Sequence, residues 1–397
     1  MVDPAPVSQD DQPTAAGVEP PLRSRRHGAW GLYRCIRFER RTDPGPTGRY
    51  RVAAVVVALG IAAIYISIVV PSDKDPFGAI WEGTFGTAIG LSTVLTVAAP
   101  LLFTGLAVAV PYRMGLWNIG GEGQLFIGAW AAAAVAFGFP HLSGLLLIPL
   151  MLIAAAIGGA LWILVPALAR AYLGVNEIIT TLMLNFVGIF WMTYWVTGPW
   201  AETGSAGGIH SRSIPEQSFL APVMVGSVEV PLGLLLGVAC ALVLWFLLRG
   251  TVLGYEVKVL GGNLRAGRYA GMPSARRLIM VMLIGGAMGG LAGAVAMVGD
   301  IHRYTDSLSA QAGYSGIVVA VLAAGFELAI PLMAVLFAAL TASGSTIQIL
   351  GESSDTTVAL MGLILLLAAM GDGLARYRIS LRRPSAARGL VEAEDEA

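Results

Sequence analysis

The chain has 397 residues, of which 56% are hydrophobic and only 13% are charged, and its formal net charge is zero. This composition is too apolar for a soluble domain and predicts a protein that crosses a membrane several times. Long runs of Leu, Ala, Val, Ile and Gly favour transmembrane helices over a closed barrel, the other structure that satisfies every backbone polar group in lipid.

The two ends of the chain are polar. Residues 1–51 are rich in Pro, Asp and Arg and hold no apolar run, so we expect a disordered, Arg-rich cytoplasmic tail without a cleaved signal peptide. Its arginines either contact anionic lipid headgroups or only enforce the membrane topology. Residues 376–397 end in acidic side chains and are expected to form a second disordered cytoplasmic tail.

Residues 52–375 form the predicted membrane domain. Apolar segments close to the roughly 20 residues that cross a bilayer lie at about 52–71, 87–111, 115–139, 144–168, 176–198, 231–249, 278–299, 314–327, 331–350 and 357–374. The predicted fold class is therefore an all-α polytopic membrane protein with about ten transmembrane helices. The segment 314–327 is too short to span, which predicts a half-helix before a break near Gly325 and Pro331.

Basic residues segregate when these spans are threaded alternately. One side receives Arg113, Arg170, Arg249, Lys258, Arg265, Arg268, Arg276 and Arg277 together with both termini, and the other receives Lys74, Arg212 and Arg303. Because cytoplasmic loops carry the excess of Lys and Arg, both termini are predicted to be cytoplasmic.

Several chemistries are missing from the sequence. A phosphate loop ends in Gly-Lys-Ser or Gly-Lys-Thr, and neither Lys74 nor Lys258 follows a glycine. The histidines are too scattered for a zinc-binding helix, so we expect no metal site. The chain therefore does not itself hydrolyse ATP.

The most unusual segment is Asn118-Ile119-Gly120-Gly121-Glu122-Gly123-Gln124, inside a stretch that is otherwise apolar and long enough to cross the membrane. A carboxylate at bilayer depth is costly and indicates function by default. Gly-rich breaks in transport helices mark binding regions, which predicts a broken helix lining a path. Asn118, one turn before Glu122, is expected on the same helix face. The alternative is that Glu122 is a buried carboxylate with a purely architectural role.

Two further predicted helices carry polar or small residues at regular helical spacing. Glu177, Thr181 and Asn185 follow one another at i, i+4 steps and form one polar stripe within 176–198. Either this stripe lines the path, or Thr181 and Asn185 hold neighbouring helices and Glu177 caps its own helix. The glycines between 285 and 293 have the spacing of close helix packing, which is the favoured interpretation.

The longest cytoplasmic loop, 250–277, has the pattern of a short amphipathic helix that ends at Gly271 and Pro273. A docking surface is favoured over an ordinary basic loop, since the loop also carries the apolar side chains of Leu264, Tyr269 and Met272. The residues expected to form this surface are Gly254, Arg265, Arg268, Tyr269 and Gly271.

At these residues the chain resembles the permease subunits of ABC importers in the branched-chain amino acid, ribose and nucleoside group, and most closely the nucleoside and simple-sugar branch. The segment Gly115-Leu116-Trp117-Asn118-Ile119-Gly120-Gly121-Glu122-Gly123-Gln124 is similar to that branch's typical Gly-Leu-Phe-Asn-Ile-Gly-Gly-Glu-Gly-Gln, with Trp117 in place of Phe. The segments 174–185 and 313–320 also fit. The resemblance covers about residues 87–375.

The resemblance implies a permease of the type II ABC importer class, in the plasma membrane of a bacterium, that forms the translocation path for nucleosides. It implies no cofactor on this chain, with ATP and Mg bound by separate cytoplasmic ATPase subunits that contact the 250–277 loop. Further implied partners are a second permease, paralogous rather than identical, and an extracytoplasmic substrate-binding lipoprotein; beyond these we expect contact with membrane lipid and none with nucleic acid. The expected substrate-pathway residues are Trp117, Asn118, Glu122, Gln124, Glu177, Thr181 and Asn185.

Other functions stay open on the sequence. The substrate is alternatively a simple sugar or a branched-chain amino acid. A proton-coupled secondary transporter would use Glu122 as its proton carrier. A membrane-embedded enzyme acting on lipid-linked sugars would need clustered acids and bases, and the cluster of Asp300, His302, Arg303 and Asp306 is better explained as a solvated loop.

Overall fold

The computed structural model describes residues 75–202, 210–323 and 325–349, together with 36–40, 377–381 and scattered positions within 56–67 and at 362. The chain divides into a membrane unit, Pro46–Gly373, and a terminal unit made of Met1–Gly45 and Leu374–Ala397. The predicted spans 52–71 and 357–374 and most of both predicted tails lie outside the described residues. Within the terminal unit, β1 (Ile36–Arg40) pairs antiparallel with β6 (Tyr377–Leu381), which the sequence did not predict.

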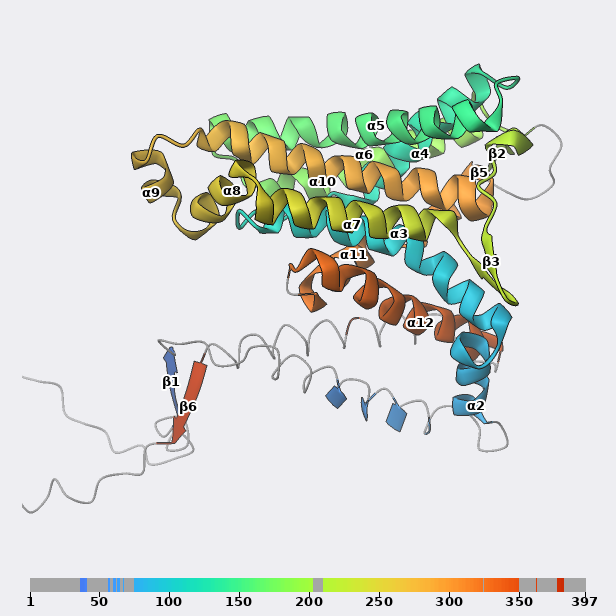
Figure 1. Ribbon diagram of the computed structural model, residues 1–397, viewed down its shortest axis with the longest axis horizontal. Coiled ribbons are helices and arrows are strands. Elements are labelled where there is room, and N and C mark those ends of the chain that lie inside the picture. The colour runs from blue at the N-terminus through green and yellow to red at the C-terminus, as the bar shows by residue number, and fades with distance from the viewer. Residues whose placement is uncertain are drawn as a thin grey trace, which may run out of the picture. The chain divides into compact units, whose positions relative to one another are not determined.

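The membrane unit is a bundle of long helices (Figure 1). Its described α-helices are α2 (Pro76–Trp81), α3 (Ala88–Tyr112), α4 (Gly121–Gly138), α5 (Gly144–Leu173), α6 (Glu177–Thr197), α7 (Leu232–Gly250), α8 (Val252–Gly262), α9 (Leu264–Tyr269), α10 (Ser274–Ala296), α11 (Ala312–Leu322) and α12 (Ile330–Ile349). Six of them, α3, α5, α6, α7, α10 and α12, are long and apolar enough to cross a membrane, two of these counted with short helical extensions. The all-α membrane fold is therefore confirmed, while the count of ten spans stays a prediction.

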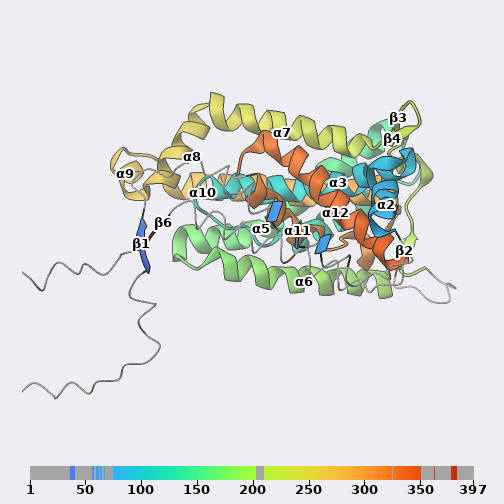
Figure 2. The same cartoon turned by 90° about the horizontal axis from the view of Figure 1, so that it is seen from below.

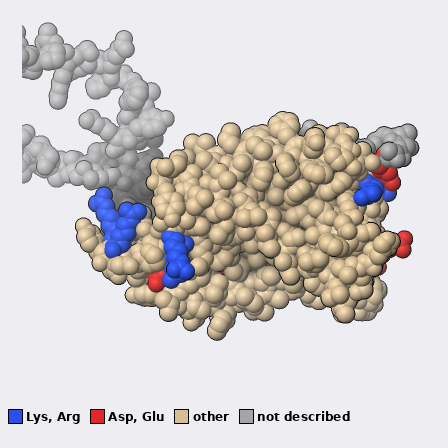
Figure 3. Space-filling view, turned by 90° about the horizontal axis from the view of Figure 1, so that it is seen from above, with Lys and Arg blue, Asp and Glu red and all other residues tan. Residues whose placement is uncertain are grey.

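The two ends of the bundle differ. The helices α8 and α9 lie at one end, and the short strands β2 (His210–Ser213), β3 (Val223–Val225), β4 (Val228–Val230) and β5 (Arg303–Thr305) lie at the other (Figures 1 and 2). Charged side chains gather at these two ends and leave an uncharged band between them on the face shown in Figure 3. We call them the basic end, with α8 and α9, and the hairpin end, where β2 pairs with β5 and β3 with β4.

The core of the bundle is formed mainly by α3, α4 and α10, whose residues are largely buried. Of the apolar window of each helix, 72% is buried in α3 and 61% in α10, against 22% in α5 and in α6. A helix that is apolar and buried all round belongs to the interior. The apolar outer faces of α5 and α6 are therefore left for lipid or for another subunit.

Glycines bring α4, α5 and α10 into close contact. A methyl group at Gly128 would overlap the backbone of Gly290, and one at Gly290 would overlap the carbonyl of Ala155. Small residues at such crossings let helix backbones approach and gain van der Waals contact, which drives association in lipid. The packing interpretation of the 285–293 glycines is thus confirmed.

The structure moves several of the predicted boundaries. Residues 115–120 are not helical, and α4 begins only at Gly121. The short helix predicted at 314–327 is α11, with 11 residues, and Gly325 has a positive φ of 65° at the break that follows it. Pro331 lies in the first turn of α12, where its missing N–H costs nothing, rather than in the break itself.

Candidate functional site

The segment 115–120, here called the re-entrant segment, runs back along α3 after that helix ends at Tyr112. Gly115 has a φ of 72°, which turns the chain, and the Asn118 side-chain amide donates to the carbonyl of Ala107 at 3.0 Å. Asn118 also accepts a hydrogen bond from the Gly120 N–H at 3.1 Å, a local turn that competes with helix formation. The prediction that Asn118 and Glu122 share a helix face was therefore wrong.

Asn118 and Gln124 form a reciprocal pair of side-chain amides. The Asn118 amide nitrogen donates to Gln124 Oε1 at 3.1 Å, and the Gln124 amide nitrogen donates to Asn118 Oδ1 at 2.8 Å. Both side chains are buried. The pair ties the re-entrant segment to the first turn of α4, and it uses the polar atoms that were predicted to face a substrate.

The polar stripe of α6 supplies partners for the re-entrant backbone. Asn185 Oδ1 accepts from the Gly123 N–H at 2.9 Å, and its amide nitrogen donates to the Ile119 carbonyl at 2.8 Å. One turn earlier, Thr181 Oγ1 accepts from the Ile119 N–H at 3.3 Å. Irregular backbone at membrane depth must find its hydrogen bonds within the protein, and these side chains provide them.

Glu177 continues this stripe at the basic end. Its Oε1 accepts from the Trp117 N–H at 3.3 Å, and its Oε2 lies 3.1 Å from Arg170 Nε. The N-cap of α6 is instead Asn176, whose side chain accepts from the Ile178 N–H at 2.9 Å. The structure thus brings together Glu177, Thr181 and Asn185 with the 117–124 segment, as a set of contacts with one another.

Glu122 joins α4 to the start of α11. Its carboxylate accepts from the Ser309 hydroxyl and, at 3.0 Å, from the Gly313 N–H in the first turn of α11. The side chain is buried, and Gly313 has no room for a Cβ because the Glu122 backbone lies against it. A carboxylate at this position complements the N-terminal end of the α11 dipole.

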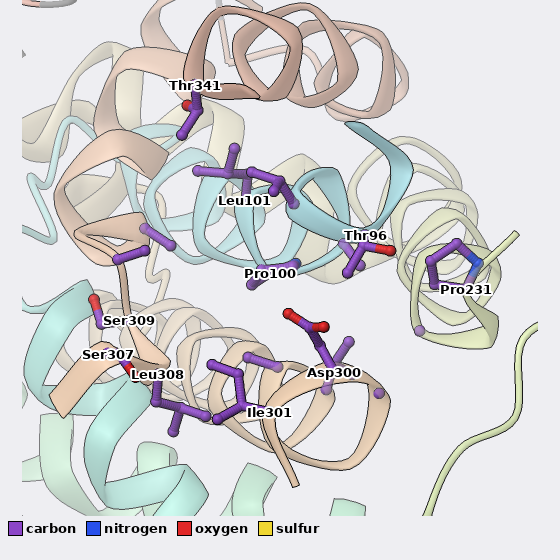
Figure 4. Close-up of a pocket in the computed structure, with 18 of the residues that line it drawn as sticks. Thr96, Pro100, Leu101, Pro231, Asp300, Ile301, Ser307, Leu308, Ser309 and Thr341 are labelled. Atoms are coloured by element: carbon purple, nitrogen blue, oxygen red, sulfur yellow. The ribbon is translucent and has the colours of Figure 1, made fainter. Parts of the chain in front are cut away.

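Ser309 connects Glu122 to a cavity of about 500 Å³. Figure 4 shows Ser307, Leu308 and Ser309 on one side of it, Pro100 and Leu101 of α3 on another, and the Asp300 carboxylate pointing toward α3. The polar residues that line the cavity are Thr96, Asp300, Ser307, Ser309, Gln311, Ser315, Thr341, Ser345 and Gln348. The other lining residues are glycines and aliphatic side chains, so the cavity offers hydrogen-bond partners within a mainly apolar surface.

The loop that forms one wall of this cavity is strained. Ala310 and Gln311 both have left-handed backbone conformations, with φ of 41° and 62°. Such conformations cost of order 1–3 kcal/mol for residues other than glycine, and they gather at functional sites. The Ser309 bond to Glu122 lies next to this strained pair, so Glu122 helps to hold the wall in place.

Sequence reasoning missed the cavity residues. Thr341, Ser345 and Gln348 line it from α12, and their spacing of four and three residues puts them on one helix face within an apolar span. Such a stripe is costly in lipid and is itself a signal of a path. Ser315 belongs to the 313–320 segment, one of those that resemble the ABC permeases, and it also lines the cavity.

Trp117 lies away from the cavity. Its ring packs edge-on against Tyr112, with the ring centroids 5.1 Å apart, at the basic end of α3. This is a packing contact within the re-entrant region. A place for Trp117 in the substrate pathway stays a prediction.

The loop predicted at 250–277 is an ordered arm formed by α8 and α9. Asn263 caps α9 by accepting from the Ala266 N–H at 3.0 Å, and Gly271 turns the chain with a φ of 77°. Tyr269 is 93% exposed, so its ring has almost no contact with the rest of the chain. The arm thus presents an ordered surface that includes an unpartnered aromatic ring.

The arm also packs against the body of the bundle. Gly254 has no room for a side chain because the Leu248 backbone lies against it, and Gly261 lies in the same way against the carbonyl of Arg113. Arg268 Nε donates to Ser274 Oγ at 3.2 Å, while Arg265 adds a second exposed positive charge. The arm therefore contacts Arg113, which lies between the end of α3 and the re-entrant segment.

The acid and base cluster at the hairpin end is more structured than the predicted solvated loop. Arg303 belongs to strand β5, and its Nη1 lies 2.6 Å from Glu202 Oε2 and 3.2 Å from His210 Nδ1. Asp300, by contrast, lines the cavity. Asp300 and Arg303 thus have different surroundings, because the chain turns between them at His302, whose φ is 57°.

A helical membrane bundle with a re-entrant segment, a strained loop and a cavity of mixed polar and apolar lining is an arrangement expected of a transport permease. The chain matches the family described as "Branched-chain amino acid transport system / permease component" over residues 90–369, and it belongs to that family. The proteins of this family are transport subunits rather than enzymes.

Three relatives illustrate the range of this family. The chain is 32% identical to a glucose ABC transporter permease protein of Haloferax volcanii over 83% of its own length and 89% of the relative's. It is 31% identical to a guanosine ABC transporter permease protein of Bacillus subtilis, over 80% and 91%. It is also 31% identical to a nucleoside ABC transporter permease protein of Lactococcus lactis, over 66% and 74%.

Proposed function

We propose that the chain is the permease subunit of an ATP-driven importer for nucleosides. The observation that carries the proposal is the cavity of about 500 Å³, in which hydroxyl, amide and carboxylate groups stand among aliphatic side chains. A nucleoside needs both kinds of contact, since its ribose requires hydrogen-bond partners and its base is flatter and less polar. Two of the relatives named above are permeases for guanosine or nucleosides.

A simple sugar is the second candidate, because another of those relatives is named for glucose. The polar groups of the lining suit a hexose as well as a ribose, but a hexose has no base to contact aliphatic residues such as Pro100, Leu101 and Leu308. A branched-chain amino acid fits less well, since no Lys or Arg stands among the described residues of the lining to pair with its carboxylate. Membership of the family favours ATP-driven import over proton coupling.

The implied partners fit the two ends of the bundle. The ordered arm with Arg265, Arg268 and Tyr269 is proposed to dock on cytoplasmic ATPase subunits, which bind ATP and Mg. The hairpin end is proposed to receive the binding lipoprotein, and the apolar faces of α5 and α6 leave area for lipid and a second permease. A relative of 24% identity, also a guanosine permease of Bacillus subtilis, supports a paralogous pair.

The proposal also includes which end of the bundle faces the cytoplasm. The described basic residues of the arm, with Arg113, Arg170 and Arg249, belong to the basic end, which supports a cytoplasmic position for that end. The antiparallel pairing of β1 with β6 supports both tails on one side of the membrane, and hence an even number of crossings.

We assign the polar motif an indirect role in the path. Glu122 acts on the cavity through Ser309, whereas Asn118, Gln124, Thr181 and Asn185 hold the re-entrant segment against α6 and α3. This explains why a costly carboxylate and three amides lie at membrane depth with their polar atoms occupied. Direct contact of these side chains with substrate stays a prediction.

The test is ATP-driven uptake of labelled guanosine, glucose and leucine by the reconstituted transporter complex. Gln348→Met removes a cavity amide with little change of shape, and we expect the KM for guanosine to rise roughly five- to a hundredfold, the equivalent of about 1–3 kcal/mol for a lost partner. Thr346→Val on the same helix is the control, because the Thr346 hydroxyl bonds only its own helix. Uptake of glucose or leucine in preference to guanosine would refute the nucleoside assignment.

A further inference from the structure

A second cavity of about 330 Å³ adjoins the first at the hairpin end. It is lined by Ile89, Ser92, Thr93, Thr96, Val97, Ser227, Glu229 and Asp300, and it shares Thr96, Val97 and Asp300 with the larger cavity. The two spaces therefore meet at Asp300. We call the smaller one the vestibule, since a solute that enters the larger cavity from the hairpin end passes along it.

Among the described residues that line it, the vestibule carries negative charge and no positive charge. Asp300 and Glu229 are both exposed, and none of the described residues that line either cavity is Lys, Arg or His. The Glu229 N–H donates to Ser92 Oγ at 2.8 Å. This bond fixes β4 on α3, so the Glu229 carboxylate stays at the vestibule. Two carboxylates thus stand along one route.

Two arginines at the hairpin end have other partners. Arg303 pairs with Glu202, and the Arg212 guanidinium lies 4.5 Å from the centroid of the Phe137 ring. Burial lowers the pKa of His302, although the neighbouring Asp300 carboxylate and the Val298 backbone act in the opposite direction. The His302 imidazole is therefore largely neutral near pH 7 and adds little positive charge beside Asp300.

The interior of the larger cavity also lacks a positive site. The N-terminal end of a helix is a natural place for an anionic group, because free N–H groups and the helix dipole favour negative charge. Here the first turn of α11 is already bound by the protein's own carboxylate, since the Gly313 N–H donates to Glu122. An anionic ligand would find neither a cationic side chain nor this helix end free.

We propose that Asp300 and Glu229 form an electrostatic filter that admits uncharged solutes and rejects anionic ones, such as phosphorylated nucleosides. The inference rests on the proposed function for the identity of the neutral solute, and it adds the specificity-determining residues and the charge class. An unphosphorylated nucleoside passes the filter, and its monophosphate, of the same shape apart from one group, does not.

The size of the effect follows from Coulomb's law. A unit charge that passes about 4 Å from one carboxylate in a water-filled mouth is disfavoured about fivefold, which is about 1 kcal/mol. Two carboxylates and the larger charge of a phosphate raise the discrimination to about tenfold or more. Because the vestibule is wet, added salt screens the effect.

The experiment measures equilibrium binding of labelled guanosine and guanosine monophosphate to the purified transporter complex in lipid nanodiscs. The variant is Asp300→Asn combined with Glu229→Gln, and the matched control is Glu216→Gln, an exposed carboxylate of the same α6 to α7 connection that lines neither cavity. We expect the preference for guanosine to fall by about tenfold in the double variant and to fall at high salt in the unmodified complex.

A second pair of probes, glucose and glucose 6-phosphate, separates the two proposals. If glucose binds in place of guanosine and its preference over the phosphate falls in the double variant, the nucleoside assignment is wrong and the filter holds. If guanosine binds but its preference is the same in the double variant and in the control, the filter is wrong. Absence of binding by all four probes would overturn both.

Discussion

Asn185 offers the sharpest test of the site's architecture. It is fully buried, and it makes two hydrogen bonds to the backbone of the 115–124 region, one accepted from the Gly123 N–H and one donated to the Ile119 carbonyl. Asn185→Ala removes both. The Gly123 N–H and the Ile119 carbonyl then lie at membrane depth without these partners, since water is absent there.

The magnitude follows from hydrogen bonds measured between membrane helices, which average about 0.6 kcal/mol and reach about 1.7 kcal/mol, so that two of them give about 1–3 kcal/mol. We expect the upper half of this range. Ile119 lies outside the helix, and Gly123 lies in the first turn of α4, where backbone N–H groups have no intrahelical acceptor.

The assay is an SDS titration of the purified transporter complex in mixed micelles, followed by tryptophan fluorescence. Thr180→Ala on the same helix is the control, because the Thr180 hydroxyl bonds only the backbone of its own helix, at Asn176 and Glu177. If Asn185→Ala unfolds at the same SDS fraction as Thr180→Ala, the α6 stripe does not hold the re-entrant segment, and the architectural explanation fails.

Three other predictions follow from the packing. Gly290→Leu forces a side chain into the Ala155 backbone and should cost about 3 kcal/mol or more, measured as loss of monodisperse protein on size exclusion. Gly138→Leu, at a glycine with open space around it, should leave the protein monodisperse. Glu327→Gln weakens the bidentate ion pair between the buried Glu327 carboxylate and the guanidinium of Arg113, whose side chain is one-third exposed. The change should cost about 1.5–3 kcal/mol in the same SDS titration. Tyr269→Ala should leave folding unchanged but lower substrate-stimulated ATPase activity; equal loss in Tyr172→Ala, an exposed tyrosine at the end of α5, would contradict a specific role for the arm.

The polar motif shows how far local sequence could lead. A carboxylate and two amides in an apolar stretch indicated a functional region, and the region does border the cavity through the contact of Glu122 with Ser309. What the motif could not reveal was its backbone. The local turn at Asn118 and the glycines after it interrupt the helix, so the side chains point toward one another.

Glu177, Thr181 and Asn185 illustrate a more reliable signal. A stripe at i, i+4 spacing in an apolar helix must face protein or water, and its position on one face of α6 is confirmed. The sequence left open whether it faced a path or another segment. The hydrogen bonds to the 117–123 backbone show that these polar atoms face another segment of the protein, because each has a partner there.

The sequence by itself determined that this is a helical membrane protein, approximately where the described helices begin and end, and which permease family it belongs to, because apolar length and motif spacing are local properties of the chain. Only the tertiary structure decided where the cavity lies. Its walls come from α3, the start of α7, the strained 306–312 loop and α12, which are far apart in sequence. Helix packing alone brings them together, and it places Asp300 where the vestibule and the larger cavity meet.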